Sequence, residues 1–483
     1  MKRVLWALAF FVTVGSTILL GQAQYKVLWN FVGWPNDGSG PVSNLVMGRN
    51  GNLYGTTSSG GTGARPSGTV FELSPNANGG WTETVLYSFC SNFSNSSCLD
   101  GAFPQSGLIL DRNGNLYGTT TIGGSGQICG FGAGCGGGTV FELSPPLSGG
   151  VWTETVLYSF CNNLSNSNCL DGSVPLAQLT FDKLGNLYGT TSTGGTGGTS
   201  GGCCVGGTVF ELSYSNGEWN ETVLHNFCGT GHNGICPDGA APQAGVALDS
   251  IGNLYGTTIA GGSLQYAGSG TVFELAPGTK GWTETVLLGP GVPLGRGGAP
   301  LSAVVLDKSG NLYGTFSFGG AGFAGGVFRY STANKSITTF SFNGGNGQTP
   351  SAGVLLDTAS ASIYGTTAGG GANQRGTIFT ISPPQQQSVL YSFCSQSDCT
   401  DGFNPLAALV SDKLGNLYGT TKLGGTETNC NGSGCGVVFQ ITPQTSAIKN
   451  PSKNKSRRPH LLSSDSSAPA STCRNTATIC SSV

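Results

Sequence analysis

One heptapeptide, GNLYGTT, recurs along the chain and constrains the fold more than any other feature. It begins at Gly51, Gly114, Gly185, Gly252 and Gly415, and looser copies begin at Gly310 and Ala361. A second motif follows each copy, as GTVFEL from Gly68, Gly138, Gly207 and Gly270 and in looser form from Gly325, Gly376 and Gly436. Two motifs that recur in phase indicate one structural unit repeated along the chain.

Each unit contains four short segments with the composition of β-strands. In the second unit they span residues 107–111, 115–120, 139–144 and 152–160, and we name these strands a, b, c and d. Aromatic and β-branched residues dominate them, and turn-forming residues such as DRNGN separate them. The glycine inside strand b lacks a side chain, which we expect to let an aromatic residue of the next unit approach closely.

The order of the strands decides the architecture. The chain opens on an isolated d strand, VLWNF from Val27, and closes with strands a, b and c near Thr442. A closed ring accounts for this order, because the first strand can complete the last unit beside residues 436–442. The sequence therefore predicts an all-β fold, a seven-bladed β-propeller of four-stranded blades whose N-terminal strand pairs with the last blade.

The two ends of the chain differ from the repeats. Residues 1–23 have basic residues, then an apolar run, then small residues, as in a secretory signal peptide. A retained N-terminal anchor helix is the alternative. The propeller is predicted over residues 24–443, and the Ser-, Lys- and Pro-rich residues 444–483 are predicted to be a disordered tail. No transmembrane segment is expected after cleavage, so the protein is predicted to be secreted or displayed on the cell surface.

The cysteines agree with export. Sixteen are present, and they fall in close pairs: Cys90 with Cys98, Cys129 with Cys135, Cys161 with Cys169, Cys228 with Cys236, Cys394 with Cys399, Cys430 with Cys435, Cys473 with Cys480, and the adjacent Cys203 and Cys204. An even number of locally paired cysteines behind a signal peptide indicates disulfides. The adjacent pair can bridge to each other or elsewhere. Zinc is the competing interpretation, but the three histidines do not stand at the required spacing.

The paired motifs LYGTT…GG…GTVFEL resemble the GloVer repeat of exported bacterial proteins of largely unknown function. The resemblance covers residues 25–443. Members of that family carry varied C-terminal anchoring signals, but residues 444–483 contain no apolar anchor segment. The sequence LDRNGNLYG is also similar to the turn of NHL-type propellers, which include ligand binders and some lyases. No catalytic motif of those proteins matches here, so no catalytic residue is assigned.

The alternation of strands predicts two unlike faces. The short a–b and c–d turns lie on one face, and the long b–c and d–a loops, which carry the paired cysteines, lie on the other. We expect binding on the long-loop face around a central funnel, because long loops on a rigid scaffold commonly bind ligands.

The d–a loops share an Asp-Gly pair before a proline. The acids are Asp37, Asp100, Asp171, Asp238 and Asp401, and Arg296 marks a loop that departs from the pattern. They form either a ring that holds Ca²⁺ or sugar hydroxyls, or structural Asx turns. No cofactor is predicted apart from Ca²⁺ under the first interpretation.

The amino-acid composition narrows the classes of function that the protein can have. Charged residues make up 9% of the chain and the net charge is −2, which argues against nucleic-acid binding. The leading hypothesis is a monomeric secreted or surface module that binds an extracellular polysaccharide or another polymer. The alternatives are a lyase or hydrolase that uses funnel carboxylates, and a scaffold that binds a surface protein.

Overall fold

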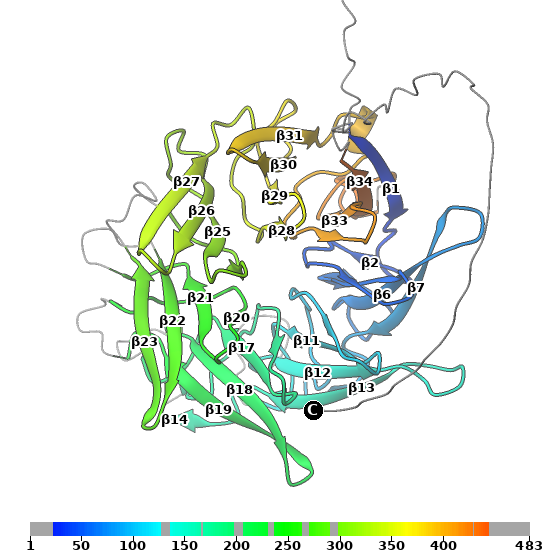
Figure 1. The fold of residues 1–483 in the computed structure, drawn as a ribbon. Helices are drawn as coiled ribbons and strands as arrows, with labels where there is room; N and C mark the ends of the chain where they lie inside the picture. The colour runs from blue at the N-terminus through cyan, green and yellow to red at the C-terminus, as the bar shows by residue number, and fades with distance from the viewer. Residues whose placement is uncertain are drawn as a thin grey trace, which may run out of the picture. The chain divides into compact units, whose positions relative to one another are not determined.

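The computed structural model describes residues 23–126, 136–165, 168–197, 206–229, 236–262, 270–289, 298–427 and 429–443. These residues form seven four-stranded antiparallel sheets in a ring, which confirms the predicted seven-bladed propeller (Figure 1). Each sheet is one blade, and the remaining sheets are short two-stranded ribbons in the long loops.

The blades follow the chain order predicted from the repeats. Blade 1 contains β3 (Val46–Met47), β4 (Leu53–Thr57), β6 (Thr69–Pro75) and β7 (Trp81–Ser88). Blade 2 contains β10 (Ile109–Leu110), β11 (Leu116–Thr120), β12 (Thr139–Ser144) and β13 (Thr153–Ser159). Blade 3 contains β16 (Thr180–Phe181), β17 (Leu187–Thr191), β18 (Thr208–Ser215) and β19 (Glu218–Asn226).

The next three blades repeat this pattern, and the two motifs vary in blades 5 and 6. Blade 4 contains β20 (Ala247–Leu248), β21 (Leu254–Thr258), β22 (Thr271–Gly278) and β23 (Gly281–Leu288). Blade 5 contains β24 (Val305–Leu306), β25 (Leu312–Phe316), β26 (Gly326–Ser331) and β27 (Ser336–Ser341). Blade 6 contains β28 (Leu355–Asp357), β29 (Ser362–Thr367), β30 (Thr377–Ser382) and β31 (Gln386–Ser392).

The seventh blade combines the two ends of the described chain. Its strands are β32 (Val410–Ser411), β33 (Leu417–Thr421), β34 (Val437–Thr442) and β1 (Gln24–Asn30). Strand β1 runs antiparallel to β34, with Gln24 opposite Thr442, Asn30 opposite Val437 and a bulge between Val27 and Trp29. The first strand of the chain therefore lies in the same sheet as the last.

The core is a series of contacts between consecutive blades. The phenylalanine that ends strand d packs edge-on against the strand c phenylalanine of the following blade, with ring centroids 5.0–5.3 Å apart. The pairs are Phe31–Phe71, Phe89–Phe141, Phe160–Phe210, Phe227–Phe273, Phe342–Phe379 and Phe393–Phe439. All these rings are fully buried. Burial of each ring contributes about 1.5–3 kcal/mol, so the same contact stabilises six of the seven blade interfaces.

The strand b glycine serves a contact within its own blade. A Cβ atom on Gly118 would lie 2.7 Å from Cζ of Phe141 and 2.9 Å from Cδ2 of Leu108. Phe141 is the cross-strand partner of Gly118 in blade 2. The prediction that this aromatic ring comes from the next unit is therefore wrong, because the strand c ring crosses over strand b of the same sheet.

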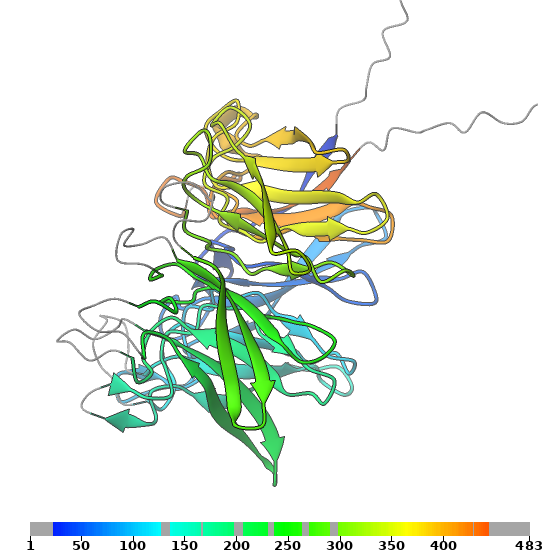
Figure 2. The same ribbon diagram turned by 60° about the vertical axis from the view of Figure 1, so that its left-hand side comes forward.

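The long loops contain short additional secondary-structure elements. They are the ribbons β2 (Gly38–Ser39) with β5 (Ser59–Gly60), β8 (Phe93–Ser94) with β9 (Ser97–Cys98), and β14 (Leu164–Ser165) with β15 (Asn168–Cys169), and the single-turn 3₁₀ helix η2 (Ser397–Cys399). Figure 2 shows these loops on the side opposite the projecting hairpins. Apart from Ala23, the predicted signal peptide and tail lie outside the described residues. Within the described ranges, no helix is long and apolar enough to span a membrane.

Candidate functional site

A groove of about 990 Å³ lies between blades 2 and 3 on the face of the short turns. Its walls are the a–b turns at residues 111–113 and 182–185, strand β13, and the tip of the β18–β19 hairpin. That hairpin has eight paired positions, from Thr208 opposite Asn226 to Ser215 opposite Glu218, and it projects from the ring in Figure 1. The groove is thus on the face opposite the one that the loop lengths favoured.

Aromatic side chains form much of the groove. The rings of Tyr117 and Phe181 meet edge-on with centroids 5.1 Å apart, and those of Tyr214 and Trp219 lie 5.4 Å apart at an angle of 56°. Tyr214 is 61% exposed at the hairpin tip. The other three rings are less accessible: Tyr117 is buried, and Phe181 and Trp219 are partly buried against the core between the two blades.

Charged groups also line the groove. The exposed Arg112 and Lys183 occupy equivalent positions of the two a–b turns, and neither forms an ion pair with any described residue. The acids beside them are already engaged, since Asp111 accepts hydrogen bonds from Asn113 N at 2.8 Å and Asn115 N at 2.9 Å. Asp182 binds its own turn in the same way. The two cations are therefore available to an acidic ligand.

One further acid, Glu142, lies in the groove. It accepts a hydrogen bond from Ser144 Oγ at 3.1 Å. Burial, together with this nearby carboxylate, raises the pKa of Tyr117 above its usual value. The Tyr117 hydroxyl is thus held within the groove wall beside Glu142.

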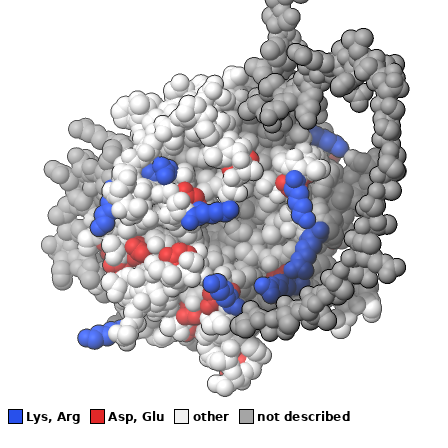
Figure 3. All heavy atoms as spheres, in the orientation of Figure 1, with Lys and Arg blue, Asp and Glu red and all other residues white. Residues whose placement is uncertain are grey.

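The face of the molecule drawn in Figure 3 has no large region of one charge among the described residues. Figure 3 shows Lys and Arg side chains spread over this view of the molecule and interspersed with Asp and Glu. Specific recognition at this surface therefore depends on local groups such as those of the groove.

The acids of the predicted Asp-Gly ring lie inside the protein instead. Asp100, Asp171 and Asp401 are 2%, 2% and 0% exposed. Asp100 accepts hydrogen bonds from Tyr87 Oη and Ser91 N, both at 2.8 Å, and so binds the end of the preceding d strand. Asp171, Asp238 and Asp401 do the same, and Asp37 binds Val32 N. An Asx turn would bind a residue further along the chain, so these aspartates are structural in a different way from the one predicted.

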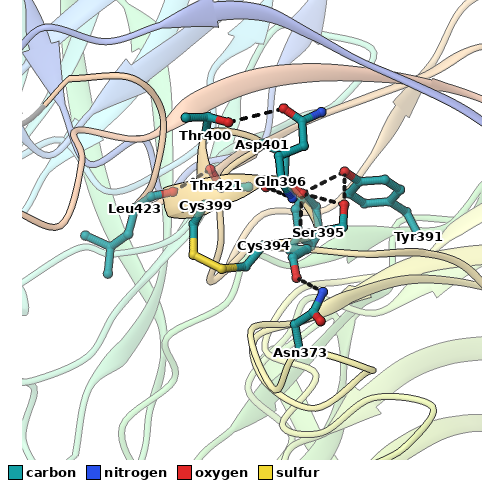
Figure 4. The surroundings of a disulfide bond; sticks show 11 residues. Asn373, Tyr391, Cys394, Ser395, Gln396, Cys399, Thr400, Asp401, Thr421 and Leu423 are labelled. Atoms are coloured by element: carbon teal, nitrogen blue, oxygen red, sulfur yellow. Dashed lines mark hydrogen bonds between the residues drawn. A yellow bond between two sulfur atoms is a disulfide. The ribbon is translucent and has the colours of Figure 1, made fainter.

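The environment of Asp401 illustrates the arrangement. Its Oδ2 accepts hydrogen bonds from Tyr391 Oη at 2.7 Å, Ser395 N at 2.9 Å and Ser395 Oγ at 3.0 Å (Figure 4). The disulfide between Cys394 and Cys399 closes the same loop. The carboxylate and the disulfide together fix the path of the chain from blade 6 to blade 7.

Five predicted disulfides are present: Cys90–Cys98, Cys161–Cys169, Cys228–Cys236, Cys394–Cys399 and Cys430–Cys435. They indicate an oxidising environment.

The other predicted pairs fall outside the described residues. Cys129 and Cys135 both lie in residues 127–135, which the structure does not describe, so their disulfide stays a prediction. The same holds for Cys203 and Cys204, and for Cys473 and Cys480. The predicted site residue Arg296 also lies outside the described ranges.

The inner ends of the blades are joined by amide side chains. Asn44 Nδ2 donates to Gln178 Oε1 at 3.3 Å, and Asn44 Oδ1 accepts from Ala408 N at 2.6 Å. Gln178 Nε2 donates to the carbonyl oxygen of Leu108 at 2.8 Å. These bonds connect blades 1, 2, 3 and 7 at the centre, where the sequence predicted a funnel.

The described residues contain no group of three or more His, Cys, Asp or Glu residues that could hold a metal ion. His225 takes the place of the strand d tyrosine, and its Nε2 lies 3.3 Å from Asp238 Oδ2. Its ring also meets Phe227 edge-on, with centroids 4.7 Å apart. In blade 3 this histidine therefore has the role that Tyr87 has in blade 1 and Tyr158 has in blade 2: its ring packs on the phenylalanine and binds the aspartate of the following loop.

Sequence reasoning missed the groove. Its distinctive residue is Tyr214, because the other c–d turns of the regular repeats have Pro75, Pro145 and Pro277 at the corresponding place. A comparison of the repeats position by position would have found this exception. The pairing of turns from different blades, by contrast, is visible only in the structure.

Comparisons with known proteins identify the family. The Gloeobacter/Verrucomicrobia repeat matches residues 16–202, 136–339 and 199–432. No curated protein matches the sequence.

Three solved structures are similar in fold. A protein from Bacteroides uniformis, provisionally named a 6-phosphogluconolactonase, is 12% identical (TM-score 0.42; 77% of this chain, 95% of that one). A provisionally named oxidoreductase (glucose dehydrogenase) from Thermus thermophilus is 14% identical, with a TM-score of 0.38, and the match covers 87% of this chain and 100% of that one. A protein of unknown function from Dyadobacter fermentans is 12% identical, with a TM-score of 0.40, and the match covers 87% of this chain and 99% of that one. Likeness at this level carries no argument about activity. The repeat matches span most of the chain, and the protein belongs to the Gloeobacter/Verrucomicrobia repeat family.

Proposed function

We propose that the protein is an exported module that binds an extracellular polysaccharide in the groove between blades 2 and 3. The observation that carries this proposal is the exposed ring of Tyr214, packed on the partly buried Trp219 beside the polar groups of the groove. The apolar faces of sugar rings pack on aromatic side chains, and their hydroxyls need hydrogen-bonding partners nearby. Export is supported by the five disulfides and by the sequence of residues 1–23.

The free cations favour a polysaccharide with acidic groups. Arg112 and Lys183 stand on two neighbouring blades, so one chain lying along the groove can meet both. An arginine binds a carboxylate or sulfate through two parallel hydrogen bonds, and a lysine adds a point charge. We therefore expect uronic-acid or sulfated polymers to bind more tightly than neutral ones, and binding to weaken with salt.

Binding suits these residues better than catalysis. The acids that a reaction in the funnel would need, Asp100, Asp171 and Asp401, are buried and bound to the protein's own backbone and tyrosines. A substrate has no access to them.

The test is a binding screen of the oxidised protein against neutral, uronic-acid and sulfated polysaccharides, followed by calorimetry. The double variant Arg112→Ala/Lys183→Ala should weaken binding of the acidic polymer at least tenfold, or about 1.4 kcal/mol. Lys413→Ala is the matched control, because Lys413 has the same turn position in blade 7 and lies outside the groove. Absence of binding to every polymer, or equal weakening by both variants, would contradict the proposal.

A further inference from the structure

A glutamate recurs at one position of strand d in the first four blades. Glu83, Glu154, Glu221 and Glu284 lie opposite Leu73, Leu143, Leu212 and Leu275 of strand c. In each glutamate Oε1 is buried and has no hydrogen-bond partner among the described residues. A buried ionised carboxylate without a partner is costly, so this arrangement needs an explanation.

An aspartate acts on each of these glutamates, and for Glu83, Glu154 and Glu221 it is the only neighbouring charge that does so. Asp37 acts on Glu83, Asp100 on Glu154, Asp171 on Glu221 and Asp238 on Glu284. Each aspartate binds the end of one blade, and its glutamate belongs to the next blade. Oδ1 of Asp100 and Oδ1 of Asp171 are also buried without a partner among the described residues. Two ionised acids that lie close together in a partly buried region repel each other, which favours the neutral form of one of them.

At the sites of Glu154 and Glu221, no other titratable group among the described residues supplies a positive charge that would compensate the two acids. Tyr87 faces both Asp100 and Glu154, and Tyr158 faces both Asp171 and Glu221. The fourth site differs, because His225 lies near Glu284 and Asp238. Burial first, and the neighbouring aspartate second, raise the pKa of Glu83, Glu154 and Glu221 to about 8. Burial also raises the pKa of Glu284, to about 7, while His225 opposes the shift.

The remaining blades use uncharged side chains at the same position. Ile337 lies opposite Tyr330 in blade 5, Gln387 opposite Ile381 in blade 6, and Tyr25 opposite Ile441 in blade 7. Gln387 is close in shape to a protonated glutamic acid. The loop before blade 6 has Asn346 where the regular loops have aspartate, so both acids of the pair are replaced there by amides.

We propose that Glu83, Glu154 and Glu221 are neutral carboxylic acids in the folded protein, and that losing their protons in alkaline solution weakens the contact between consecutive blades. The uncharged residues of blades 5, 6 and 7 show that this position tolerates groups without charge. The propeller is then a structure whose stability depends on protons held between its blades.

The direction of the pH effect follows from proton linkage. The unfolded chain loses these protons near the pKa of an exposed glutamate, about 4.3, whereas the folded protein keeps them up to about pH 8. The stabilisation is therefore complete below about pH 4.3 and is lost as the pH rises to about 8. We therefore expect the contribution of these three groups to the unfolding free energy to be greatest in acid and to fall as the pH rises.

The experiment compares thermal unfolding of the full chain from pH 5 to pH 9 with that of Glu154→Gln/Glu221→Gln. The wild-type melting temperature should fall as pH rises. The melting temperature of the double variant should fall less with pH and should lie several degrees above that of the wild type at pH 9. Glu218→Gln, at an exposed position of β19, is the matched control and should follow the wild type. Parallel curves for the wild type and the double variant would overturn the proposal.

A second measurement does not depend on the variants folding. Infrared spectra of the wild type in heavy water at pH 6 should contain the carbonyl band of protonated carboxyl groups, because exposed acids are ionised there. The band should disappear at alkaline pH. Its absence at pH 6 would overturn the proposal. So would a rise in melting temperature with Ca²⁺ that the double variant lacks, because a bound cation would then supply the missing charge.

Discussion

The contact between blades 2 and 3 contains two regions of opposite character. Its interior repeats what every regular interface has: the pair of Phe160 and Phe210, and the bond from Tyr158 Oη to Asp171 Oδ2 at 2.9 Å. Its surface groove contains residues that the other repeats lack, above all Tyr214. A residue that repeats is explained by the fold. A residue that breaks the repeat at an exposed site needs another explanation, and binding is the one that we propose.

The aspartates show why this distinction matters. A ring of five Asp-Gly pairs suggests a shared ligand when only the sequence is known. The structure gives each aspartate a separate local role, since Asp100 binds Tyr87 and Ser91 while Asp401 binds Tyr391 and Ser395. Repetition of this acid around the propeller therefore reflects five similar connections between blades and does not by itself indicate a ligand.

The largest expected effect is at the interior, where the first strand joins the last blade. Deletion of residues 24–30 removes β1, including the buried Leu28, and leaves the edge of β34 unpaired. We expect loss of more than about 5 kcal/mol of unfolding free energy, measured by thermal and denaturant unfolding. Lys26→Ala, which changes an exposed side chain of the same strand, is the control. A deletion variant that melts like the wild type would mean that β1 is not needed to hold the propeller.

A smaller effect is expected when one repeated acid is removed. Asp100→Ala leaves Tyr87 Oη and Ser91 N without their acceptor in a buried place. We expect a loss of about 2–4 kcal/mol in denaturant unfolding, with polysaccharide binding unchanged. Asp412→Ala is the comparison, because Asp412 closes a solvent-exposed turn through Leu414 N and Asn416 N and should lose about 1 kcal/mol. Weaker polymer binding by folded Asp100→Ala would restore a ligand role for the acid ring.

The sequence predicted the architecture well because the fold is periodic. Spacing of the GNLYGTT and GTVFEL motifs was enough to locate strands b and c, and the isolated VLWNF segment led to the pairing of β1 with β34. Local disulfides such as Cys90–Cys98 followed from cysteine spacing alone. In each case the partners are close in sequence, or the order of strands in the repeat defines their place.

What the sequence could not predict depends on contacts between blades. Glu154 and Asp100 are 54 positions apart, and nothing in the sequence places one near the other. The groove likewise needs the turns of blades 2 and 3 to be brought together with the tip of the β18–β19 hairpin. Loop length favoured the other face, although residues in a tight turn are equally well held by the scaffold.

The smallest effect on stability, and the sharpest test of the comparison, is expected at Tyr214. Its side chain is 61% exposed, so Tyr214→Ala should change the unfolding free energy by no more than about 0.5 kcal/mol. Binding of the acidic polymer should nevertheless weaken about tenfold, measured by calorimetry. Tyr214→Pro is the matched variant, because it restores the proline that Pro75 and Pro277 provide opposite Trp81 and Trp282. If both variants bind as the wild type does, the exception at Tyr214 is neutral variation and the groove is not the binding site.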